Sequence, residues 1–308
     1  MVQPVSPLSG HKIEKIQSVK DYLVSGQDFD LYHDEQWDML LTYPVPDNLE
    51  NYYESTDYKP HHHQNTSLFD RLYNFIRRRN YAYKYSLMKQ YHSKMQSVLD
   101  YGTATGEFLD YLSKKTPRVS GVEPNKNARN IANKRLNNKV KVSIDDITGK
   151  YDAITLWHVL EHVKNIDELI EKLKQRLSKK GILVIAVPNF KSYDAKLYGA
   201  SWAAYDVPRH LWHFSPLAIQ KLFDKHEMKV IGQKPLFFDS FYVSLLSEQY
   251  KTGKKNFFKA FFTGLKSNWY ARKTGQYSSL VYIIQKKIEF NYFLIILYLT
   301  FKFSTLGC

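Results

Sequence analysis

Between residues 96 and 235 the sequence alternates short apolar runs with longer amphipathic stretches, and this alternation constrains the fold more than any other feature. The stretches between the runs predict helices, including 125–136 after a capping Asn125 and 166–177 with Gly181 beyond its end. The apolar runs, together with SSLVYIIQ further along the chain, give seven predicted strands: SVLDYG, RVSGVE, KVKVSI, DAITLWHV, GILVIAVP, MKVIGQ and SSLVYIIQ. Strands alternating with helices predict an α/β fold, a doubly wound and mostly parallel seven-stranded sheet whose ligand lies at the carboxyl ends of the strands.

Other segments surround this predicted sheet. Residues 19–42 alternate like a small antiparallel sheet, and from Ser67 apolar residues recur at helical spacing. The aromatic and basic region 236–277 is too long for a plain connection. We therefore predict a cap over 1–65, a helical lead-in over 66–95, a sheet domain over 96–288 with a lid insertion over 236–277, and an apolar tail over 289–308.

Composition excludes several kinds of chemistry. The single cysteine is Cys308, the last residue, so no disulfide framework, cysteine-based zinc site or cysteine nucleophile is expected inside the fold, and a cytoplasmic location fits. No metal site is predicted, because adjacent histidines such as those at 61–63 rarely point at one ion.

The apolar stretch 290–301 is shorter than the ~20 residues that cross a bilayer. With a formal net charge of +14, anionic partners stay open: a membrane surface, a phosphorylated substrate or nucleic acid.

The end of the first predicted strand carries an acid and two glycines. In Asp100-Tyr101-Gly102-Thr103-Ala104-Thr105-Gly106, the glycines allow a tight turn and a close backbone approach to a ligand. The spacing differs from the G-x-G-x-x-G of a dinucleotide cradle, and an acid in the loop suits a cationic ligand. Glu123 ends the second strand, where an acid can accept hydrogen bonds from both ribose hydroxyls.

These motifs, with IDDI, YDAITLWHVLEHV and GILVIAVPN after them, resemble in order and spacing those of class I S-adenosylmethionine-dependent methyltransferases. They look most like the subgroup that methylates small molecules, which includes ubiquinone-biosynthesis O-methyltransferases. The resemblance covers about residues 96–235 and implies a Rossmann-like sheet with S-adenosylmethionine as cofactor.

The resemblance also implies roles for individual residues. Asp100, Gly102, Thr103, Ala104 and Gly106 would cradle the methionine part of the cofactor, and Glu123 would hold its ribose. On the adenine side, Pro124 and Ile147 would flank the ring, Asp146 would meet its amino group, and Trp157 and His158 would line the wall beside the sulfonium. Ala104 departs from the family, which usually has glycine there. Relatives with a YPVPDNLENYYES-like segment often begin with a four-cysteine zinc ribbon, so the cap here is expected to be metal-free, with Tyr52, Tyr53 and Tyr58 closing over the cofactor.

The segment YGASWAAYDVPRHLWHFS is the predicted acceptor site. Methyl transfer from a sulfonium requires an aligned nucleophile and, for a hydroxyl, removal of its proton. We predict His210 as the general base, with His213 as the alternative, and Trp202, Tyr205 and Arg209 as substrate contacts. The expected acceptor is a hydroxyl on a small molecule, a sugar or a lipid-linked compound.

Two other functions stay open. Nucleic-acid methylation is disfavoured, because the only cysteine is terminal and LWHVLEH stands where base-amine methylases carry an Asn/Asp-Pro-Pro-aromatic turn. A ribose 2′-hydroxyl would be the remaining nucleic-acid target. A non-catalytic protein that keeps the sheet without the cofactor is the third possibility, and Ala104 is its single indication.

Overall fold

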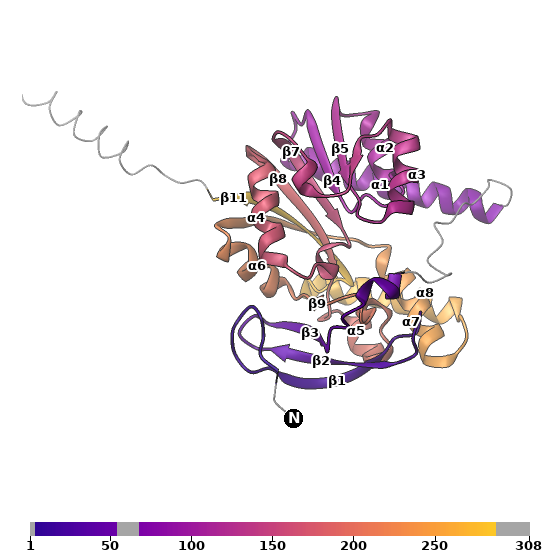
Figure 1. The fold of residues 1–308 in the computed structure, drawn as a ribbon. Helices are drawn as coiled ribbons and strands as arrows, with labels where there is room; N and C mark the ends of the chain where they lie inside the picture. Colours follow the sequence, from indigo (N-terminus) through magenta and orange to yellow (C-terminus); the bar gives the residue numbers. More distant parts are fainter. Residues whose placement is uncertain (1–3, 54–67, 288–308) are drawn as a thin grey trace, which may run out of the picture.

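The computed structural model describes residues 4–53 and 68–287, with the side chains of 68–76 excepted. Its elements form two sheets, a large one with helices on both faces and a small antiparallel one beneath it in Figure 1. The tail 289–308, the histidines 61–63, Tyr58 and Ser67, where the helical spacing begins, lie outside the described residues.

The large sheet has the predicted seven strands. Their order is β10-β11-β8-β7-β4-β5-β6, and only β11 runs antiparallel to its neighbours. The strands are β4 (Ser97–Tyr101), β5 (Arg118–Val122), β6 (Val140–Lys141), β7 (Tyr151–Trp157), β8 (Leu177–Pro188), β10 (Met228–Pro235) and β11 (Ser279–Lys286). The doubly wound, mostly parallel fold is thus confirmed, and the strand order places the carboxyl ends of β4, β5 and β7 side by side.

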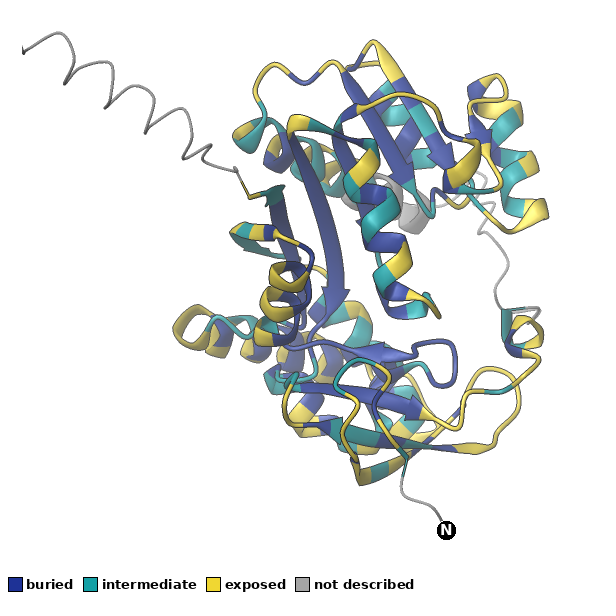
Figure 2. Cartoon of the chain, turned by 60° about the vertical axis from the view of Figure 1, so that its left-hand side comes forward, coloured by how far each residue is buried: buried dark blue, intermediate teal, exposed yellow. Residues whose placement is uncertain are grey.

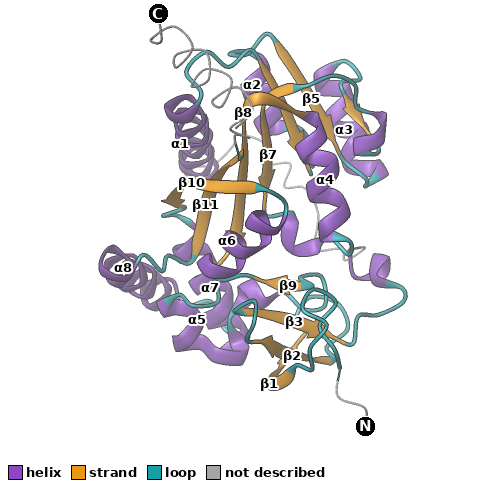
Figure 3. Cartoon of the chain, turned by 90° about the vertical axis from the view of Figure 1, so that its left-hand side faces the viewer, coloured by secondary structure: helices purple, strands orange, loops and turns teal. Residues whose placement is uncertain are grey.

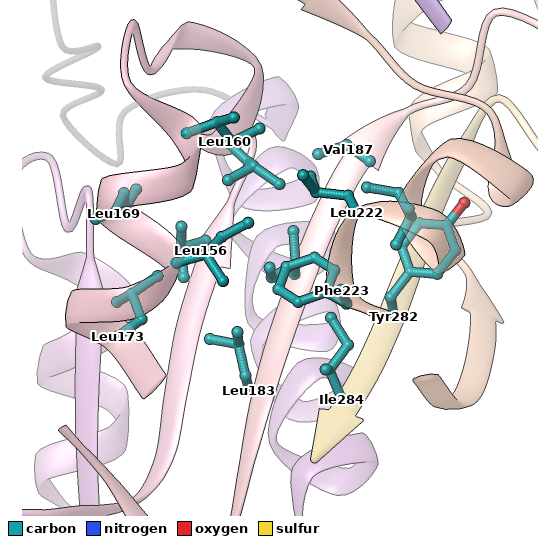
Figure 4. Packing of buried hydrophobic residues seen from close by; sticks show 14 of the residues in the cluster. Leu156, Leu160, Leu169, Leu173, Leu183, Val187, Leu222, Phe223, Tyr282 and Ile284 are labelled. Carbon is teal, nitrogen blue, oxygen red and sulfur yellow. The ribbon is translucent and has the colours of Figure 1, made fainter. Parts of the chain in front are cut away.

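Alternation along β8 builds a core on each face of this sheet. Leu183, Ile185 and Val187 pack with α4 (Ile166–Arg176) and α6 (Pro216–Lys225), as Figure 4 shows for Leu183 and Val187 beside Leu173 and Phe223. Ile182, Val184 and Ala186 pack on the opposite side with α1 (Leu68–Tyr91), α2 (Glu107–Ser113) and α3 (Lys126–Leu136). The central strands are accordingly buried along most of their length (Figure 2).

The small sheet forms the cap. Its strands are β1 (Glu14–Lys20), β2 (Asp28–Asp34), β3 (Met39–Tyr43) and β9 (Trp212–His213), all antiparallel and in that order. β9 comes from the predicted acceptor segment, so this segment is part of the cap (Figure 3). Sequence reasoning missed this strand, since two residues carry no periodicity.

Helices and short turns fill the connection around the cap. They are α5 (Tyr193–Tyr198), α7 (Asp239–Thr252), α8 (Phe257–Thr274) and the 3-10 turns η1 (Leu49–Tyr53), η3 (Leu160–His162), η4 (Gly199–Ser201) and η5 (Ala203–Tyr205). A further 3-10 turn, η2 (Ile144–Asp146), follows β6 in the large sheet and contacts α4. The predicted insertion 236–277 contains α7 and α8, which lie against α5 next to the cap sheet (Figure 1).

Several predicted boundaries were wrong. The first cap strand is Glu14–Lys20 and does not run on from Val19, because the chain turns at Asp21, whose carboxylate accepts from the N–H groups of residues 23–25. Gly181 does not stop a helix but lies inside β8, where a Cβ would approach Tyr151 O to 2.9 Å. The third sheet strand, predicted over 139–144, is only Val140–Lys141, since the chain then forms η2.

Candidate functional site

Two glycines shape the loop that follows β4. Gly102 and Gly106 both have a φ of +77°, a left-handed conformation that glycine adopts without steric cost. A Cβ on Gly102 would lie 2.4 Å from Val159 Cγ2, and one on Gly106 would lie 2.9 Å from Leu136 Cδ1. The loop therefore packs against the segment after β7 on one side and against α3 on the other.

Ala104 stands in the middle of this loop with a φ of +47°. An L-residue in this region costs roughly 1–2 kcal/mol, so alanine is strained where glycine would not be. Its N–H donates to Glu123 Oε2 at 2.8 Å, and the N–H of Asn125 donates to Oε1 at 2.9 Å. These two bonds fix Glu123 at the end of β5, beside the loop. Thr103 is buried, and its N–H donates to Val122 O.

Asp100 is a buried acid at the end of β4. It is 3% exposed and accepts a hydrogen bond from the hydroxyl of Thr155 on β7. Burial raises its pKa to about 6, although the hydroxyls of Thr155 and Thr103 and the charge of Lys84 act in the opposite direction. A carboxylate held in this way is stabilised by any cation that enters the site.

Lys84, on α1, places a positive charge in the same region. Its Nζ lies 4.1 Å from the centre of the Trp157 ring and 5.3 Å from that of Phe108, within the range of cation–π attraction. Burial lowers the pKa of Lys84 to about 8, and the negative charges of Asp239 and Asp100 oppose this shift. Sequence reasoning missed Lys84; the available signal was a lysine among the tyrosines of an otherwise aromatic stretch of helix.

His158 connects this region to the insertion. Its Nε2 lies 2.9 Å from Asp239 Oδ2 on α7, and its Nδ1 lies 3.5 Å from Glu161 Oε1. Burial disfavours the imidazolium, but Asp239 and Glu161 outweigh burial and raise the pKa of His158 to about 10. His158 is therefore charged at neutral pH, and its backbone is also strained, with a φ of +56°.

Glu161, His162 and His210 form a compact cluster next to His158. One ligand-type atom of each lies within 4.8 Å of those of the other two. The rings of His162 and His210 have centroids 4.6 Å apart. Burial, with the nearby His210, lowers the pKa of His162 to about 4, so its ring is neutral. Burial opposes ionisation of Glu161, but the His158, His210 and His162 side chains outweigh it and lower the pKa of this carboxyl.

His210, the predicted base, thus lies among groups that sequence reasoning did not connect with it. Glu161 and His162 were visible in LWHVLEH, but only the fold brings this turn to a loop about fifty residues further along. His213, the alternative, lies in β9 with its Nε2 2.9 Å from Thr42 Oγ1. Because Thr42 donates its hydroxyl hydrogen to His210 O, His213 donates from Nε2.

The predicted substrate residues are buried and engaged with protein groups. Arg209 is 2% exposed and pairs with Asp206 at 2.7 Å and Asp21 at 3.0 Å, which ties the acceptor segment to the cap. Trp202 donates from Nε1 to Asp194 Oδ2 at 2.8 Å, and Tyr205 packs edge-on to it. Their role in binding an acceptor stays a prediction.

The predicted adenine side lies beyond Glu123. Pro124 is exposed there, while Ile147 is buried in the core on the α4 face. Asp146 accepts from the N–H of Ser143 at 3.1 Å and so closes the capping box of η2. Their contacts with adenine likewise stay predictions.

The strand order, the acid-bearing glycine loop after β4 and the acid after β5 define a class: α/β proteins that bind a nucleoside cofactor at the carboxyl edge of the sheet. Residues 54–233, more than half of the chain, match the family described as "Methyltransferase domain", and the chain belongs to this family. The matched region is a class I S-adenosylmethionine-dependent methyltransferase domain.

Known proteins with similar sequences are O-methyltransferases. The ubiquinone biosynthesis O-methyltransferase of Rhodopseudomonas palustris (strain TIE-1) is 25% identical over 158 residues, 46% of this chain and 62% of that protein. The protein of the same name from Bradyrhizobium diazoefficiens is 28% identical over 130 residues, 38% of this chain and 51% of its own. The chain thus matches between about half and three fifths of the length of these relatives.

Solved structures with similar folds are more distant in sequence. The cyclopropane synthase MmaA2 from Mycobacterium tuberculosis is 12% identical, with a TM-score of 0.46 over 65% of this chain and 83% of that one. The plantazolicin methyltransferase BpumL, in complex with SAH, is 20% identical, with a TM-score of 0.42 over 66% of this chain and 80% of that one.

Proposed function

We propose that this methyltransferase transfers the methyl group of S-adenosylmethionine to a hydroxyl oxygen of a small-molecule or lipid-linked acceptor. The observation that carries the cofactor geometry is a pair of opposite charges: Asp100 at the end of β4, and Lys84 on α1, which lies over Trp157 at the end of β7. The amino-acid end of the cofactor is a zwitterion. Asp100 would pair with its ammonium and Lys84 with its carboxylate, while Glu123 would accept from the ribose hydroxyls.

The acceptor would lie on the other side of His158, next to Glu161, His162 and His210. An oxygen electron pair attacks the methyl carbon, the carbon–sulfur bond breaks with its electrons going to sulfur, and the hydroxyl proton leaves the oxygen. His210 is the proposed proton acceptor. Its Nδ1 lies 2.9 Å from the carbonyl oxygen of Ala204 and so carries hydrogen, which leaves a lone pair on Nε2.

Calorimetric titration with S-adenosylhomocysteine tests the cofactor geometry. Lys84→Met should weaken this ligand about tenfold but leave the affinity for 5′-methylthioadenosine, which lacks the amino-acid end, within threefold. Glu123→Gln should weaken both ligands, because both carry the ribose. Equal effects of Lys84→Met on the two ligands would contradict the placement. The acceptor itself would appear as a product one methylene heavier when cell extracts with and without the enzyme are compared.

The helices α7 and α8 favour an acceptor that is presented at a membrane surface. α8 buries small residues and exposes large ones: Ala260, Thr263, Gly264, Ser267 and Ala271 are inside, whereas Phe258, Phe261, Phe262, Leu265 and Trp269 are exposed. A Cβ on Gly264 would lie 2.7 Å from the ring of Phe241 on α7, so small residues let the two helices approach closely. The spacing of the exposed set gathers it on one side of α8.

Charge accompanies these exposed aromatic residues. The segment 236–277 contains seven basic residues and two acids, Asp239 and Glu248. Asp239 is bound to His158, and the Glu248 side chain is 1% exposed, so the outer surface of these helices is aromatic and cationic. Such a surface suits the interface of a bilayer that contains anionic lipid. In the part of the chain that the structure describes, no helix is long and apolar enough to cross a membrane.

Sedimentation with vesicles tests this surface. The protein should pellet with vesicles of phosphatidylglycerol and phosphatidylcholine and stay in the supernatant with phosphatidylcholine alone. Phe258→Ser/Phe262→Ser should reduce the bound fraction at least fivefold, because about 1.5–3 kcal/mol is gained by fully burying each such side chain. Tyr43→Ser, at an exposed position of the cap, is the matched control. A double variant that binds vesicles like the control, or one that only changes the oligomeric state, would contradict the proposal that this surface binds membranes.

A further inference from the structure

The cluster of Glu161, His162 and His210 contains two side chains, Glu161 and His162, beyond the one histidine that accepting a proton requires. Its three side chains come from η3 and from the loop before β9, and Glu161 is 0% exposed. Neither carboxylate oxygen of Glu161 has a hydrogen-bond partner among the described residues. The charged imidazole of His158 lies next to this carboxylate, with its Nδ1 3.5 Å from Oε1. The hydrogen-bonding capacity of this buried carboxylate is therefore left largely unused, which costs folding free energy unless a further group binds it.

Both histidines are held by backbone carbonyl groups. Nδ1 of His162 lies 3.0 Å from Arg209 O, and Nδ1 of His210 lies 2.9 Å from Ala204 O. A carbonyl oxygen only accepts, so we assign the hydrogen of each ring to Nδ1. Each Nε2 is then a lone-pair donor. Fixing a ligand imidazole through its other nitrogen is the usual arrangement of outer partners around protein-bound metals.

We infer that Glu161, His162 and His210 bind a divalent transition-metal ion through one carboxylate and two Nε2 atoms. Two imidazoles and a carboxylate are a ligand set typical of zinc sites that keep a position open for a water or substrate. Ligands ~2.1 Å from an ion in tetrahedral geometry lie roughly 3.4 Å apart. One ligand-type atom of each side chain already lies within 4.8 Å of those of the other two, so side-chain rotations would bring the three ligands to this spacing.

This site deepens the proposed function and rests on it for its role in catalysis. An acceptor hydroxyl that occupies the open position would bind the ion through its oxygen, and its pKa would fall. Its proton would then pass to solvent water, and His210 would act as a ligand instead of taking the proton. The resulting alkoxide is the nucleophile that displaces the sulfur of the cofactor. Binding of the ion itself needs neither cofactor nor acceptor.

The test measures metal binding directly. The tag-free protein carries His61→Ala, His62→Ala and His63→Ala to remove three adjacent histidines as a competing site, is treated with chelator, and is titrated with Zn²⁺ by calorimetry. One ion per chain is expected. Glu161→Gln and His210→Ala should each weaken binding at least 100-fold. His226→Asn, a buried histidine that contacts Asp167 and Glu171 elsewhere, should stay within threefold and is the matched control.

A second measurement covers variants that fail to fold. Co²⁺ added to the parent protein should give visible absorption bands of a site with nitrogen and oxygen ligands, and one equivalent of Zn²⁺ should remove them. A folded parent that binds no Zn²⁺ or Co²⁺, or Zn²⁺ affinities equal across all variants, would overturn the inference. S-adenosylhomocysteine titration of the same samples separates the two claims. Cofactor binding without metal binding refutes only the metal site, and metal binding without cofactor binding refutes only the proposed cofactor geometry.

Discussion

The carboxyl edge of the large sheet has two halves that are built differently. In the cofactor half, Asp100 and Glu123 stand at neighbouring strand ends and are fixed by hydrogen bonds from Thr155, Ala104 and Asn125. In the acceptor half, His162 and His210 meet through contacts among η1, η3 and the loop before β9. The cofactor half therefore depends on the sheet and on α1, which supplies Lys84, whereas the acceptor half depends on the docking of the cap. Substitutions should separate the two.

The largest expected effect is at Arg209, which joins the cap to the acceptor segment. Arg209→Met leaves Asp21 buried without its partner, and breaking a buried pair costs about 3–5 kcal/mol. Urea unfolding should show this loss. Lys15→Met, which removes the partly exposed pair with Asp30, should cost less than about 1 kcal/mol. A loss at Arg209 no larger than at Lys15 would mean that the cap docks without this pair.

His210→Ala should affect the acceptor half alone. Turnover should fall roughly 10²- to 10⁴-fold, because the substitution removes the proposed proton acceptor and, in the metal-bound form, a ligand of the ion. The affinity for S-adenosylhomocysteine should stay within threefold, because no described contact joins His210 to the loop after β4. Turnover is measured with the acceptor found in the extract comparison. Retained activity would remove His210 from the mechanism, and lost cofactor affinity would show that the halves are coupled.

Asp100→Asn should affect the cofactor half alone, weakening S-adenosylmethionine by about 1–3 kcal/mol through the lost charge-assisted bond. The wild-type affinity should also depend on pH. The pKa of Asp100 is about 6 without cofactor, and the ligand ammonium favours the ionised carboxylate, so protons compete with the ligand below pH 6. Affinity should fall by up to about tenfold for each pH unit below 6. Calorimetry between pH 5 and 8 checks this, and an equally steep acid limb in Asp100→Asn would assign it to another group.

The smallest expected effect is at Ala104. With a φ of +47°, Ala104→Gly should relieve strain and stabilise the protein by about 1 kcal/mol, less the entropy that glycine adds to the unfolded chain. Thermal unfolding measures the gain. Destabilisation would show that the alanine methyl group makes a contact that outweighs its backbone cost.

Local sequence signals explain which parts could be predicted. The strands, the glycine turn and the helix cap at Asn125 follow from residues close together in the chain, and the structure confirms them. Gly181 misled the helix boundary, since a glycine required by close packing inside a strand looks like a helix stop. The two-residue strand β9 was missed because its partner, β3, lies about 170 residues earlier.

The residues of the site divide in the same way, into those that local sequence signals predict and those that only tertiary packing brings to the site. Asp100 and Glu123 were found because each stands at the end of a predicted strand, and His158 because the family resemblance implied it. Lys84 and Asp239 were missed, since α1 and α7 reach the sheet edge only through tertiary packing. Arg209 was singled out by its residue type, but its partners could not be predicted. The two carboxylates that bind it come from the cap and from its own loop.

The central claim is that the edge formed by β4, β5 and β7 binds the cofactor independently of the acceptor half. The most direct measurement is calorimetric titration of wild-type, Glu123→Gln and His210→Ala proteins with S-adenosylhomocysteine. We predict one site per chain, an affinity lowered about 10- to 100-fold in Glu123→Gln, and an affinity within threefold of wild type in His210→Ala. Absence of binding to the folded wild-type protein, or equal affinity in Glu123→Gln, would contradict the account.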